Sequence, residues 1–310
     1  MGRIKNILSE LWGTYLYYKF KHLYEKNPTL AADALYYKIY KRHMNLDNPK
    51  NLIEKITWLS LNTDTSLWTL CADKYRMRSY VEEKGCGDYL PILYGHWDNP
   101  YDIDFDTLPN EFVLKANNGC GTVMIVRDKS QLDIRATQTT LKKWLKRPFG
   151  YWGAQKHYLS IKPCIIAEQL LKQDESEKEF SPHSIADYKV WCFKGKPECV
   201  WVAMNRKPRH LNMSLFDQDW EAMPQHLVST SHYEYNKNII VPRPNCLEKM
   251  LNIASIISEP FDEVRVDFYV VNNQPVIGEL TFTTGYGYFT DKYYDYLGSK
   301  IDLPNFNTNI

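Results

Sequence analysis

Two apolar segments near the C-terminal end of the chain constrain its fold most. Residues 264–270 (VRVDFYV) and 275–281 (PVIGELT) flank Asn272-Asn273, and an Asn-Asn pair between two apolar runs predicts a β-hairpin. Asp267 and Glu279 then stand on neighbouring strands. An ionised carboxylate in an apolar segment is costly unless a cation or hydrogen bonds compensate it. A bound divalent metal would supply that compensation.

The donor atoms of this hairpin indicate which metal to expect. Two oxygen ligands with no His or Cys beside them suit Mg2+, which keeps several waters and is shared with substrate phosphates. The structural alternative is an ion pair between Asp267 and Arg265, because side chains two apart share a strand face. That alternative explains Glu279 poorly, so we predict a metal site.

Size and charge limit the classes of function. With 310 residues the chain can bury a sizeable core, and its length favours two or three subdomains. The hydrophobic share of 44% and the charged share of 24% are ordinary for a soluble protein. Proteins that follow phosphate backbones carry a clear basic excess, and this chain has a net charge of only +1. We therefore expect no nucleic-acid partner.

Cysteine usage and hydropathy indicate a cytoplasmic protein. The seven cysteines are scattered, odd in number and without CxxC spacing, so neither a disulfide framework nor a zinc site is predicted. No apolar run approaches the roughly 20 residues of a membrane-spanning helix. The N-terminus also lacks the apolar core and cleavage site of a signal peptide.

The first 40 residues show the spacing of an amphipathic helix. Apolar and aromatic residues recur every three or four positions, at Ile4, Leu8, Leu11, Tyr15 and Tyr18. Through Lys26 the segment carries five Lys or Arg against two Glu. A basic, aromatic helix can lie on an anionic bilayer, which would place the protein at the inner face of the membrane. The alternative is that the helix packs onto its own domain.

The remaining pattern predicts an α+β protein with antiparallel sheets. Helices are expected at 51–59, at 73–81 with Asp73 as N-cap, at 131–145 and at 247–257, and strands at 112–115, 123–126 and 165–171. Residues 188–193 and 199–203 read as a second hairpin. We predict a helix-rich region over 1–90 and two further subdomains over 91–165 and 166–310.

One glycine-containing loop is a candidate phosphate site. Lys115 ends a short strand, and Asn118, Gly119, Cys120 and Gly121 follow before the next strand. Backbone N–H groups of such a turn can hold phosphate oxygens while the lysine neutralises charge. There is no GxxxxGK[ST] motif, and no third glycine follows at the dinucleotide spacing. Taken alone, the segment is better explained as an ordinary β-turn.

Together these elements resemble a known superfamily. Lys74, Lys115 with its loop, residues 166–171 (IAEQLL), Lys189 and the Arg265-x-Asp267 hairpin follow the order of the ATP-grasp nucleotide site. The hairpin resembles the R-x-D-F-F-V and N-E-I-N-T-x-P-G elements of D-alanine:D-alanine ligases. Residues 48–50 (NPK), 54–59 (EKITWL), 72–75 (ADKY), 112–115 (FVLK), 187–189 (DYK) and 278–282 (GELTF) are similar to the TupA-like (teichuronopeptide biosynthesis) ATP-grasp family of bacterial surface-polysaccharide clusters. This resemblance runs from about residue 46 to 287.

The resemblance implies a fold and a set of roles. Two α+β subdomains would grip ATP between antiparallel sheets. Lys74 and Lys115 match the lysines that contact ATP phosphates, and Gly119 to Gly121 match the loop that closes over them. The hinge that meets adenine corresponds to Glu168, Gln169, Leu170 and Leu171. Asp267 and Glu279 match the Mg2+ ligands, and Arg265 matches the arginine that stabilises charge on the transferred phosphoryl group.

Some positions depart from the superfamily pattern. Thr281 stands where Asn is usual two residues after the metal-binding Glu, and its hydroxyl is a poorer Mg2+ ligand, which weakens the case for a second metal. Cys120 replaces a Ser or another small residue, and no His base can be placed beside it for nucleophilic chemistry. His183 reads as a loop residue. Lys189 requires an anion in its apolar strand, which is either a substrate or a core carboxylate.

These features predict an ATP-dependent carboxylate–amine ligase that acts through an acylphosphate. The resemblance implies a small-molecule or lipid-linked glycan acceptor and an amino acid or amino sugar, in capsule or exopolysaccharide biosynthesis. One alternative is a transferase, either a kinase or a glycosyltransferase acting on a surface glycan. The DxD-like Asp102-Ile103-Asp104 formally fits a glycosyltransferase but lies in a turn-rich crossing segment. Another alternative is a non-catalytic nucleotide-binding subunit.

Overall fold

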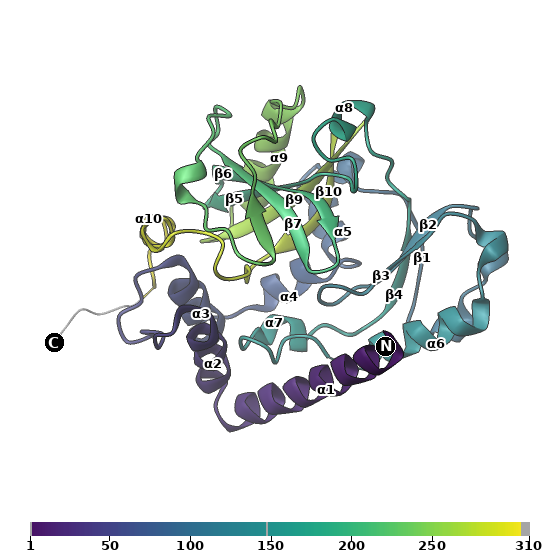
Figure 1. Cartoon of the computed structure of the whole chain (residues 1–310), viewed down its shortest axis with the longest axis horizontal. Helices are drawn as coiled ribbons and strands as arrows, with labels where there is room; N and C mark the ends of the chain where they lie inside the picture. The colour runs from purple at the N-terminus through teal and green to yellow at the C-terminus, as the bar shows by residue number, and fades with distance from the viewer. Residues whose placement is uncertain (1, 147, 305–310) are drawn as a thin grey trace.

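Two β-sheets and a set of N-terminal helices make up the protein (Figure 1). The computed structural model describes residues 2–146 and 148–304, with the side chains of the first helix described from Trp12 onward. One sheet has four strands in the order β1-β4-β2-β3, and the other has six in the order β10-β9-β5-β6-β7-β8. Neighbouring strands are antiparallel except for β7 and β8, which are parallel. The predicted α+β class is confirmed.

The N-terminal region is helical, as predicted, but the helix at Ser66–Ala72 was not expected from the sequence. Its helices are α1 (Gly2–Lys26), α2 (Pro28–Tyr40), α3 (Leu52–Asn62), α4 (Ser66–Ala72) and α5 (Met77–Glu83). The long predicted helix divides at Asn27, whose side chain accepts a hydrogen bond from the backbone N–H of Thr29. Pro28 then begins α2 with its φ already suited to the first turn. At α3, Asn51 and Glu54 form a reciprocal capping box.

The segment after Asp73 differs from the prediction. Its carboxylate accepts hydrogen bonds from the backbone N–H groups of Tyr75 and Arg76, so it stabilises a turn, and α5 begins only at Met77. An Asp cap satisfies donors in a turn as well as at a helix end. The turn fixes Lys74, whose backbone N–H donates to the carbonyl of Asn117 at 3.0 Å.

The four-stranded sheet contains β1 (Leu93–Trp97), β2 (Phe112–Ala116), β3 (Val123–Val126) and β4 (Ile165–Glu168). Between β3 and β4 run α6 (Ile134–Leu145) and α7 (Lys156–Leu159). The core of this sheet is built from Phe112, Leu114, Ile165 and Leu141, which are fully buried. Strand β4 pairs with both β1 and β2, and after Glu168 the chain leaves this sheet for the six-stranded one.

The six-stranded sheet carries the larger core. Its strands are β5 (Asp187–Phe193), β6 (Lys196–Lys207), β7 (His210–Phe216), β8 (Tyr233–Tyr235), β9 (Val264–Val271) and β10 (Gln274–Thr281), accompanied by α8 (Glu175–Lys178), α9 (Leu247–Ser258) and α10 (Asp291–Ser299). Helix α9 packs on β5, β6, β9 and β10. Short 3-10 turns are η1 (Gly87–Tyr89), η2 (Pro100–Asp102), η3 (Phe105–Thr107), η4 (Lys129–Gln131) and η5 (Pro224–His226).

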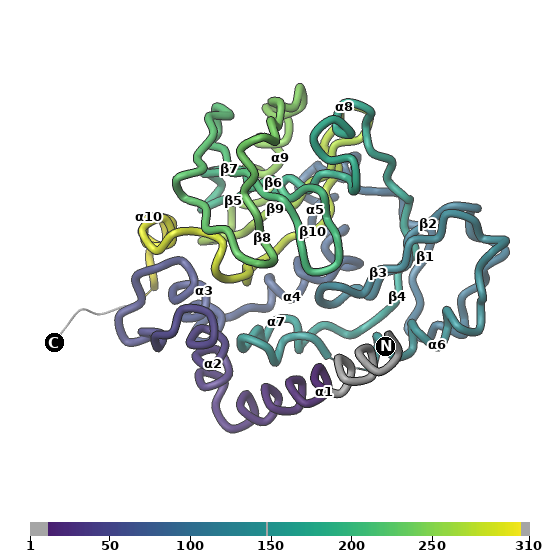
Figure 2. Tube along the Cα trace, in the orientation of Figure 1, coloured from purple at the N-terminus to yellow at the C-terminus, as the bar shows by residue number. Residues whose placement is uncertain are grey.

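Helices α4 and α7 lie between the six-stranded sheet and α1 in the view of Figure 2, and α1 runs along the outer edge of the molecule. The inner side of α1 buries Phe20 against Ala31, Ala32 and Leu35 of α2 and packs on Trp152. None of the helices in the described part of the chain is long and apolar enough to cross a membrane.

A glycine at the contact of α3 and α10 gives a test of the packing. A Cβ atom on Gly298 would lie 2.2 Å from the carbonyl oxygen of Lys50 and 2.7 Å from the backbone of Asn51. We predict that Gly298→Ala lowers the free energy of unfolding by about 1–3 kcal/mol, the usual cost of overpacking a core. Thermal unfolding followed by circular dichroism measures the effect.

Gly13→Ala is the matched control, because a Cβ at this position of α1 meets no atom within 4 Å. Alanine also favours the helix by up to about 1 kcal/mol. Equal melting temperatures for the two variants would contradict the close contact between α3 and α10.

Candidate functional site

Asp267 and Glu279 lie directly opposite each other on β9 and β10. The turn that joins these strands is the predicted two-residue one, with Asn272 and Asn273 at φ angles of 50° and 59°. These positive angles are those of a type I′ hairpin, and Asn adopts them more readily than most residues. The predicted hairpin is confirmed.

A β-bulge brings the two carboxylates to the same face. From the turn inward, Gln274 pairs with Val271 and Ile277 with Phe268. Continued regularly, this register would place Gly278 opposite Asp267 and would turn Glu279 to the other face. The register instead shifts by one residue between Ile277 and Glu279, so Glu279 pairs with Asp267. A glycine inside a strand is a known signal of a bulge, and Gly278 is that residue.

Asp267 is the centre of a buried ion-pair cluster. Arg265 Nε donates to Asp267 Oδ1 at 2.6 Å, and Arg265 Nη2 donates to Oδ2 at 2.7 Å. The ammonium group of Lys189 donates to the same Oδ2 and lies 2.6 Å from Asp187 Oδ2. The two ion pairs considered from the sequence are therefore both present: Asp267 with Arg265, and Lys189 with a core carboxylate.

Glu279 connects the two sheets through Lys74. The ammonium group of Lys74 lies 2.9 Å from Glu279 Oε2 and donates to the carbonyl oxygen of Gly119 at 2.8 Å. Gly119 belongs to the loop between β2 and β3, whereas Glu279 belongs to β10 of the other sheet. Lys74 thus joins the candidate phosphate loop to the candidate metal site.

Electrostatics keep this connection ionic. Burial raises the pKa of Glu279, but the charges of Lys74, Lys189 and Arg265 outweigh it and hold the pKa well below its ordinary value. Burial lowers the pKa of Lys74, and the neighbouring Glu279 more than reverses that effect. The carboxylate and the ammonium group therefore remain charged at neutral pH.

Lys115 lies on the four-stranded sheet and is paired. Its ammonium group donates to Glu168 Oε2 at 2.8 Å, and Arg78 Nη1 lies 3.6 Å from the other oxygen of that carboxylate. Glu168 is almost fully buried at the end of β4. Beyond it, the backbone N–H of Gln169 donates to the carbonyl of Ile92, while Leu170 and Leu171 are half-buried. The predicted hinge residues thus follow directly on the Lys115 site.

The glycine loop is anchored at its base and open at its tip. Asn117 Nδ2 donates to the carbonyl of Lys162, and Asn117 Oδ1 accepts from the backbone N–H of Cys164. Asn118 and Gly119 are buried, whereas Cys120 and Gly121 are exposed. Gly119 has a φ of +86°, and a Cβ there would lie 2.4 Å from the ring of Phe149. Only glycine fits this position.

The donor chemistry of the cluster suits magnesium. Asp267 and Glu279 offer carboxylate oxygens on one face, and Mg2+ is commonly held by one or two carboxylates together with substrate phosphates. Among the described residues no group of three His, Cys, Asp or Glu side chains is arranged to hold a metal by itself. Thr281 lies on the same face, and its hydroxyl accepts a hydrogen bond from Arg265 Nη2 at 3.1 Å.

Several residues of the cluster were not singled out from the sequence. Asp187 precedes Lys189 by two positions on the same strand face, and this spacing was the available signal. Thr284 accepts a hydrogen bond from Arg265 Nη1 and contacts the hydroxyl of Tyr288. Arg265 also lies over the ring of Trp191 at 5.4 Å from its centroid. These last contacts join distant segments, and no local pattern predicts them.

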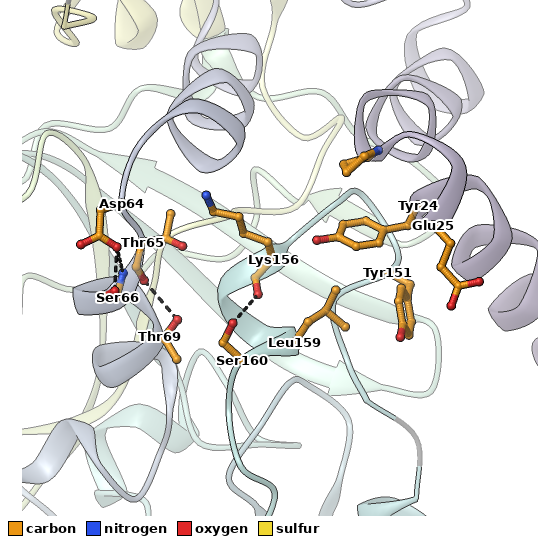
Figure 3. A pocket seen from close by; sticks show the side chains of 11 residues that line it. Tyr24, Glu25, Asp64, Thr65, Ser66, Thr69, Tyr151, Lys156, Leu159 and Ser160 are labelled. Atoms are coloured by element: carbon orange, nitrogen blue, oxygen red, sulfur yellow. Dashed lines mark hydrogen bonds between the residues drawn. The ribbon is translucent and has the colours of Figure 1, made fainter.

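A separate hollow of about 800 Å³ is lined by residues of α1, α4 and α7, among others (Figure 3). Tyr24 and Tyr151 stand on one side of it, and Asp64, Thr65 and Ser66 stand on the other. Its polar groups are largely bonded within the protein. Lys156 donates to the carbonyl of Thr63, and Asp64 accepts from the backbone N–H and hydroxyl of Ser66. The ion-pair cluster is therefore the better candidate for the functional site.

Comparison with known proteins identifies the class. Lys74 joins the two sheets. The candidate phosphate-binding Lys115 lies on one sheet, and the carboxylates of Asp267 and Glu279 lie on the other. This is the organisation expected of an ATP-grasp protein. The family described as TupA-like ATPgrasp matches residues 54–302, which is most of the chain. The chain therefore belongs to the TupA-like ATP-grasp family, and the predicted family and fold are confirmed. No curated protein gives a significant match.

Solved structures give more distant likenesses. The D-alanine--D-alanine ligase of Bacillus anthracis in complex with ATP is 15% identical, with a TM-score of 0.45, over 76% of this chain and 65% of that one. The L-amino acid ligase of Bacillus licheniformis is 14% identical, with a TM-score of 0.42, over 78% of this chain and 50% of that one. The chain thus spans less than two thirds of either enzyme's length. The family assignment rests on the family match.

Thiol labelling tests the arrangement of the glycine loop. All seven cysteines are free, and only Cys120 is exposed. We predict that Ellman's reagent at pH 8 rapidly modifies one thiol per native chain, and that Cys120→Ser removes this reaction. A non-hydrolysable ATP analogue with Mg2+ should slow the reaction at least about fivefold, because it covers the loop. Absorbance at 412 nm gives the count and the rate.

Burial and the Glu279 carboxylate raise the pKa of the Cys120 thiol, so the rate should still increase above the pH at which an ordinary cysteine levels off. Rapid labelling of several thiols, or a rate that the analogue leaves unchanged, would contradict the loop as described.

Proposed function

We propose that this protein is an ATP-dependent carboxylate–amine ligase that works through an acylphosphate. The observation that carries the proposal is the double contact of Lys74 with Gly119 and Glu279, which joins a phosphate-type loop to a carboxylate pair. Family membership supports the same nucleotide chemistry. Such a site can hold a triphosphate from both ends.

The nucleotide would lie between the two sheets. Lys115 and Lys74 would meet the phosphates together with the backbone N–H groups of residues 119–121, and adenine would lie against Glu168 to Leu171. Lys115 is partly exposed, so it can turn from Glu168 toward a phosphate, and Arg78, 3.6 Å from the buried Glu168 carboxylate, would remain as the partner of that charge. The charge type of each residue agrees with its proposed role.

Asp267 and Glu279 would hold Mg2+, which when bound neutralises charge on the nucleotide phosphates. The protein's own part is to position the reactants and to stabilise charge, as phosphoryl transfer requires. Arg265 is fixed by Asp267, Thr281 and Thr284, so its guanidinium is held in one orientation for an anionic transition state. Lys189 adds a second fixed positive charge on the same face.

The reaction would proceed in two balanced steps. A carboxylate oxygen of the first substrate attacks the terminal phosphorus of ATP and ADP leaves, which gives an acylphosphate. The amine of the second substrate then attacks the acyl carbon, loses a proton as the C–N bond forms, and expels inorganic phosphate. We propose a sugar uronate or amino acid as the carboxylate and an amino acid or amino sugar as the amine, in capsule or exopolysaccharide assembly. This choice of substrates rests on the family resemblance alone.

A product assay separates the ligase from its alternatives. A ligase releases ADP and free phosphate only when both substrates are present, whereas a glycan kinase leaves the phosphate on its product. The contact between Thr281 and Arg265 favours the third candidate, a nucleotide-binding subunit without turnover, because this hydroxyl is engaged away from a metal. Nucleotide binding without ADP release, with every carboxylate and amine pair, would support that candidate and overturn the ligase.

Substitution of the two carboxylates tests the metal role. We predict that Asp267→Asn and Glu279→Gln each lower Mg2+-dependent ADP release at least about 100-fold. Asp267→Asn should also lower stability, by roughly 1–3 kcal/mol, because it weakens the compensation of Arg265 and Lys189. Coupled ADP assays and thermal unfolding measure the two effects.

Glu175→Gln, at an exposed carboxylate of α8, is the control and should change neither quantity. Full activity in both Asp267→Asn and Glu279→Gln would remove these residues from the metal site.

We also propose that α1 contacts an anionic membrane surface. Trp12, Tyr15 and Tyr18 are 62%, 54% and 62% exposed, and Lys19 and Lys26 are exposed on the same helix. The side chains of Arg3 and Lys5, which contributed to the basic character of the sequence, lie outside the described residues. Aromatic and basic side chains together suit the headgroup region of a bilayer.

Vesicle sedimentation tests this contact. The protein should sediment with phosphatidylglycerol vesicles and remain in solution with phosphatidylcholine vesicles, and the triple variant Trp12→Ala, Tyr15→Ala, Tyr18→Ala should lose at least half of the bound fraction. Tyr101→Ala is the control, because Tyr101 is 57% exposed on the four-stranded half of the molecule. No sedimentation with either lipid would refute the contact.

A further inference from the structure

A second β-bulge lies on the same sheet as the one that places Glu279. On β6 and β7, Met204 pairs with Asn212, and the next recorded pair is Lys207 with His210. Between these two pairs β6 advances by three residues and β7 by only two. Strand β6 therefore contains one extra residue, at Asn205 or Arg206. Asn205 has a φ of 53°, the left-handed region that bulge residues often adopt.

The bulge is held from several sides. The backbone N–H of Asn205 donates to Ser181 Oγ at 3.0 Å, and Asn205 Nδ2 donates to the carbonyl of Phe180 at 3.0 Å. The backbone N–H of Arg206 donates to Ser184 Oγ at 2.9 Å. Unusual backbone angles that the surroundings fix in this way are often found at functional sites.

The bulge determines which face Arg206 occupies. Trp201 pairs with Lys189 and Ala203 pairs with Asp187, so the odd-numbered residues of β6 lie on the ion-pair face. Regular alternation would turn Arg206 to the opposite face. Arg206 Nη2 instead lies 3.5 Å from Asp187 Oδ2. The extra residue therefore adds an arginine to the face that carries Asp267 and Lys189.

Arg206 is the most weakly engaged cation of this face among the described residues. Its Asp187 contact is long, and that oxygen already bonds Lys189 at 2.6 Å. The side chain of Arg206 is 54% exposed, whereas those of Lys74, Lys189 and Arg265 are at most 11% exposed. These four cations face three carboxylates, those of Asp187, Asp267 and Glu279. One positive charge is left over, on the side chain that is most accessible.

We propose that Arg206 binds the reacting oxyanion, which is either the terminal phosphate of the nucleotide or the carboxylate of the first substrate. The guanidinium offers paired N–H donors that match either group. It lies on the face of the six-stranded sheet that carries Asp267 and Glu279, and Lys74 joins Glu279 to the glycine loop of the other sheet. This inference rests on the proposed function and adds to it a residue that selects anionic substrates.

Calorimetric titration of the full chain tests the inference. ADP and the ATP analogue AMP-PNP, each with Mg2+, are titrated into wild type, Arg206→Ala, Arg206→Lys and the control Lys207→Ala, which removes an equal charge from the next position. If the terminal phosphate is the ligand, Arg206→Ala weakens AMP-PNP binding about 10- to 100-fold and leaves ADP binding within twofold. Arg206→Lys should restore part of the affinity, because it keeps the charge but loses the paired donors.

A second set of titrations covers the carboxylate. With MgADP present, D-glucuronate and L-glutamate serve as probes, and thermal shift reports their binding. If the carboxylate is the ligand, wild type responds to at least one probe, Arg206→Ala loses the response and AMP-PNP affinity is unchanged. Asn205→Gly, which retains the positive φ, should behave as wild type, whereas the β-branched Asn205→Val should behave as Arg206→Ala.

The outcomes separate this inference from the proposed function. Failure of wild type to bind ADP would overturn the proposed function itself. Normal ADP binding, with Arg206→Ala indistinguishable from wild type for AMP-PNP and for both probes, would overturn the role of Arg206 and leave the nucleotide site intact. Equal loss in Lys207→Ala would also overturn it, because the effect would then be one of net charge.

Discussion

The structure of the site depends on one extra residue in β10. The bulge at Gly278 moves Glu279 from the face that carries the buried Val266 and Phe268 to the face that carries Asp267. Without it, Glu279 would be buried among apolar side chains, Lys74 would lose its carboxylate partner, and the glycine loop would lose its connection to the six-stranded sheet. A ring of Tyr269 packs so closely on Gly278 that a Cβ there would lie 2.9 Å from it, which explains why glycine occupies the bulge.

The charged side chains of the cluster are paired with one another. Asp267 is satisfied by Arg265 and Lys189, Glu279 by Lys74, and Lys115 by Glu168. Buried charges are tolerated only with such partners, and removal of one partner leaves the other costly. A metal ion with a polyphosphate can exchange for these contacts in a matched way, because cations of the protein move to phosphate oxygens while carboxylates move to the metal. Under the proposed function, the same network would serve stability without the ligand and binding with it.

The sequence predicted which segments form helices and strands better than it predicted which face of a sheet each side chain occupies. The hairpin followed from Asn272-Asn273, and the break between α1 and α2 at Asn27-Pro28 agrees with local chemistry. The position of Glu279 did not follow from alternation, because a two-residue turn with a regular register puts it opposite Val266. Gly278 was the available signal for the shift. The helix expected at Asp73 begins four residues later, because the carboxylate stabilises a turn first. Arg206, Thr284 and Tyr288 join the site through tertiary contacts that leave no mark on local sequence.

If the proposed function is correct, Lys74, Lys115, Asp267 and Glu279 surround a single nucleotide. A crystal structure of the protein with AMP-PNP and Mg2+ tests it most directly. We predict adenine against residues 168–171, phosphates at Lys74, Lys115 and the loop of residues 118–121, and a metal ion held by Asp267 and Glu279. A nucleotide bound elsewhere, such as in the hollow beside Tyr24 and Tyr151, with the Lys74–Glu279 contact unchanged, would contradict it.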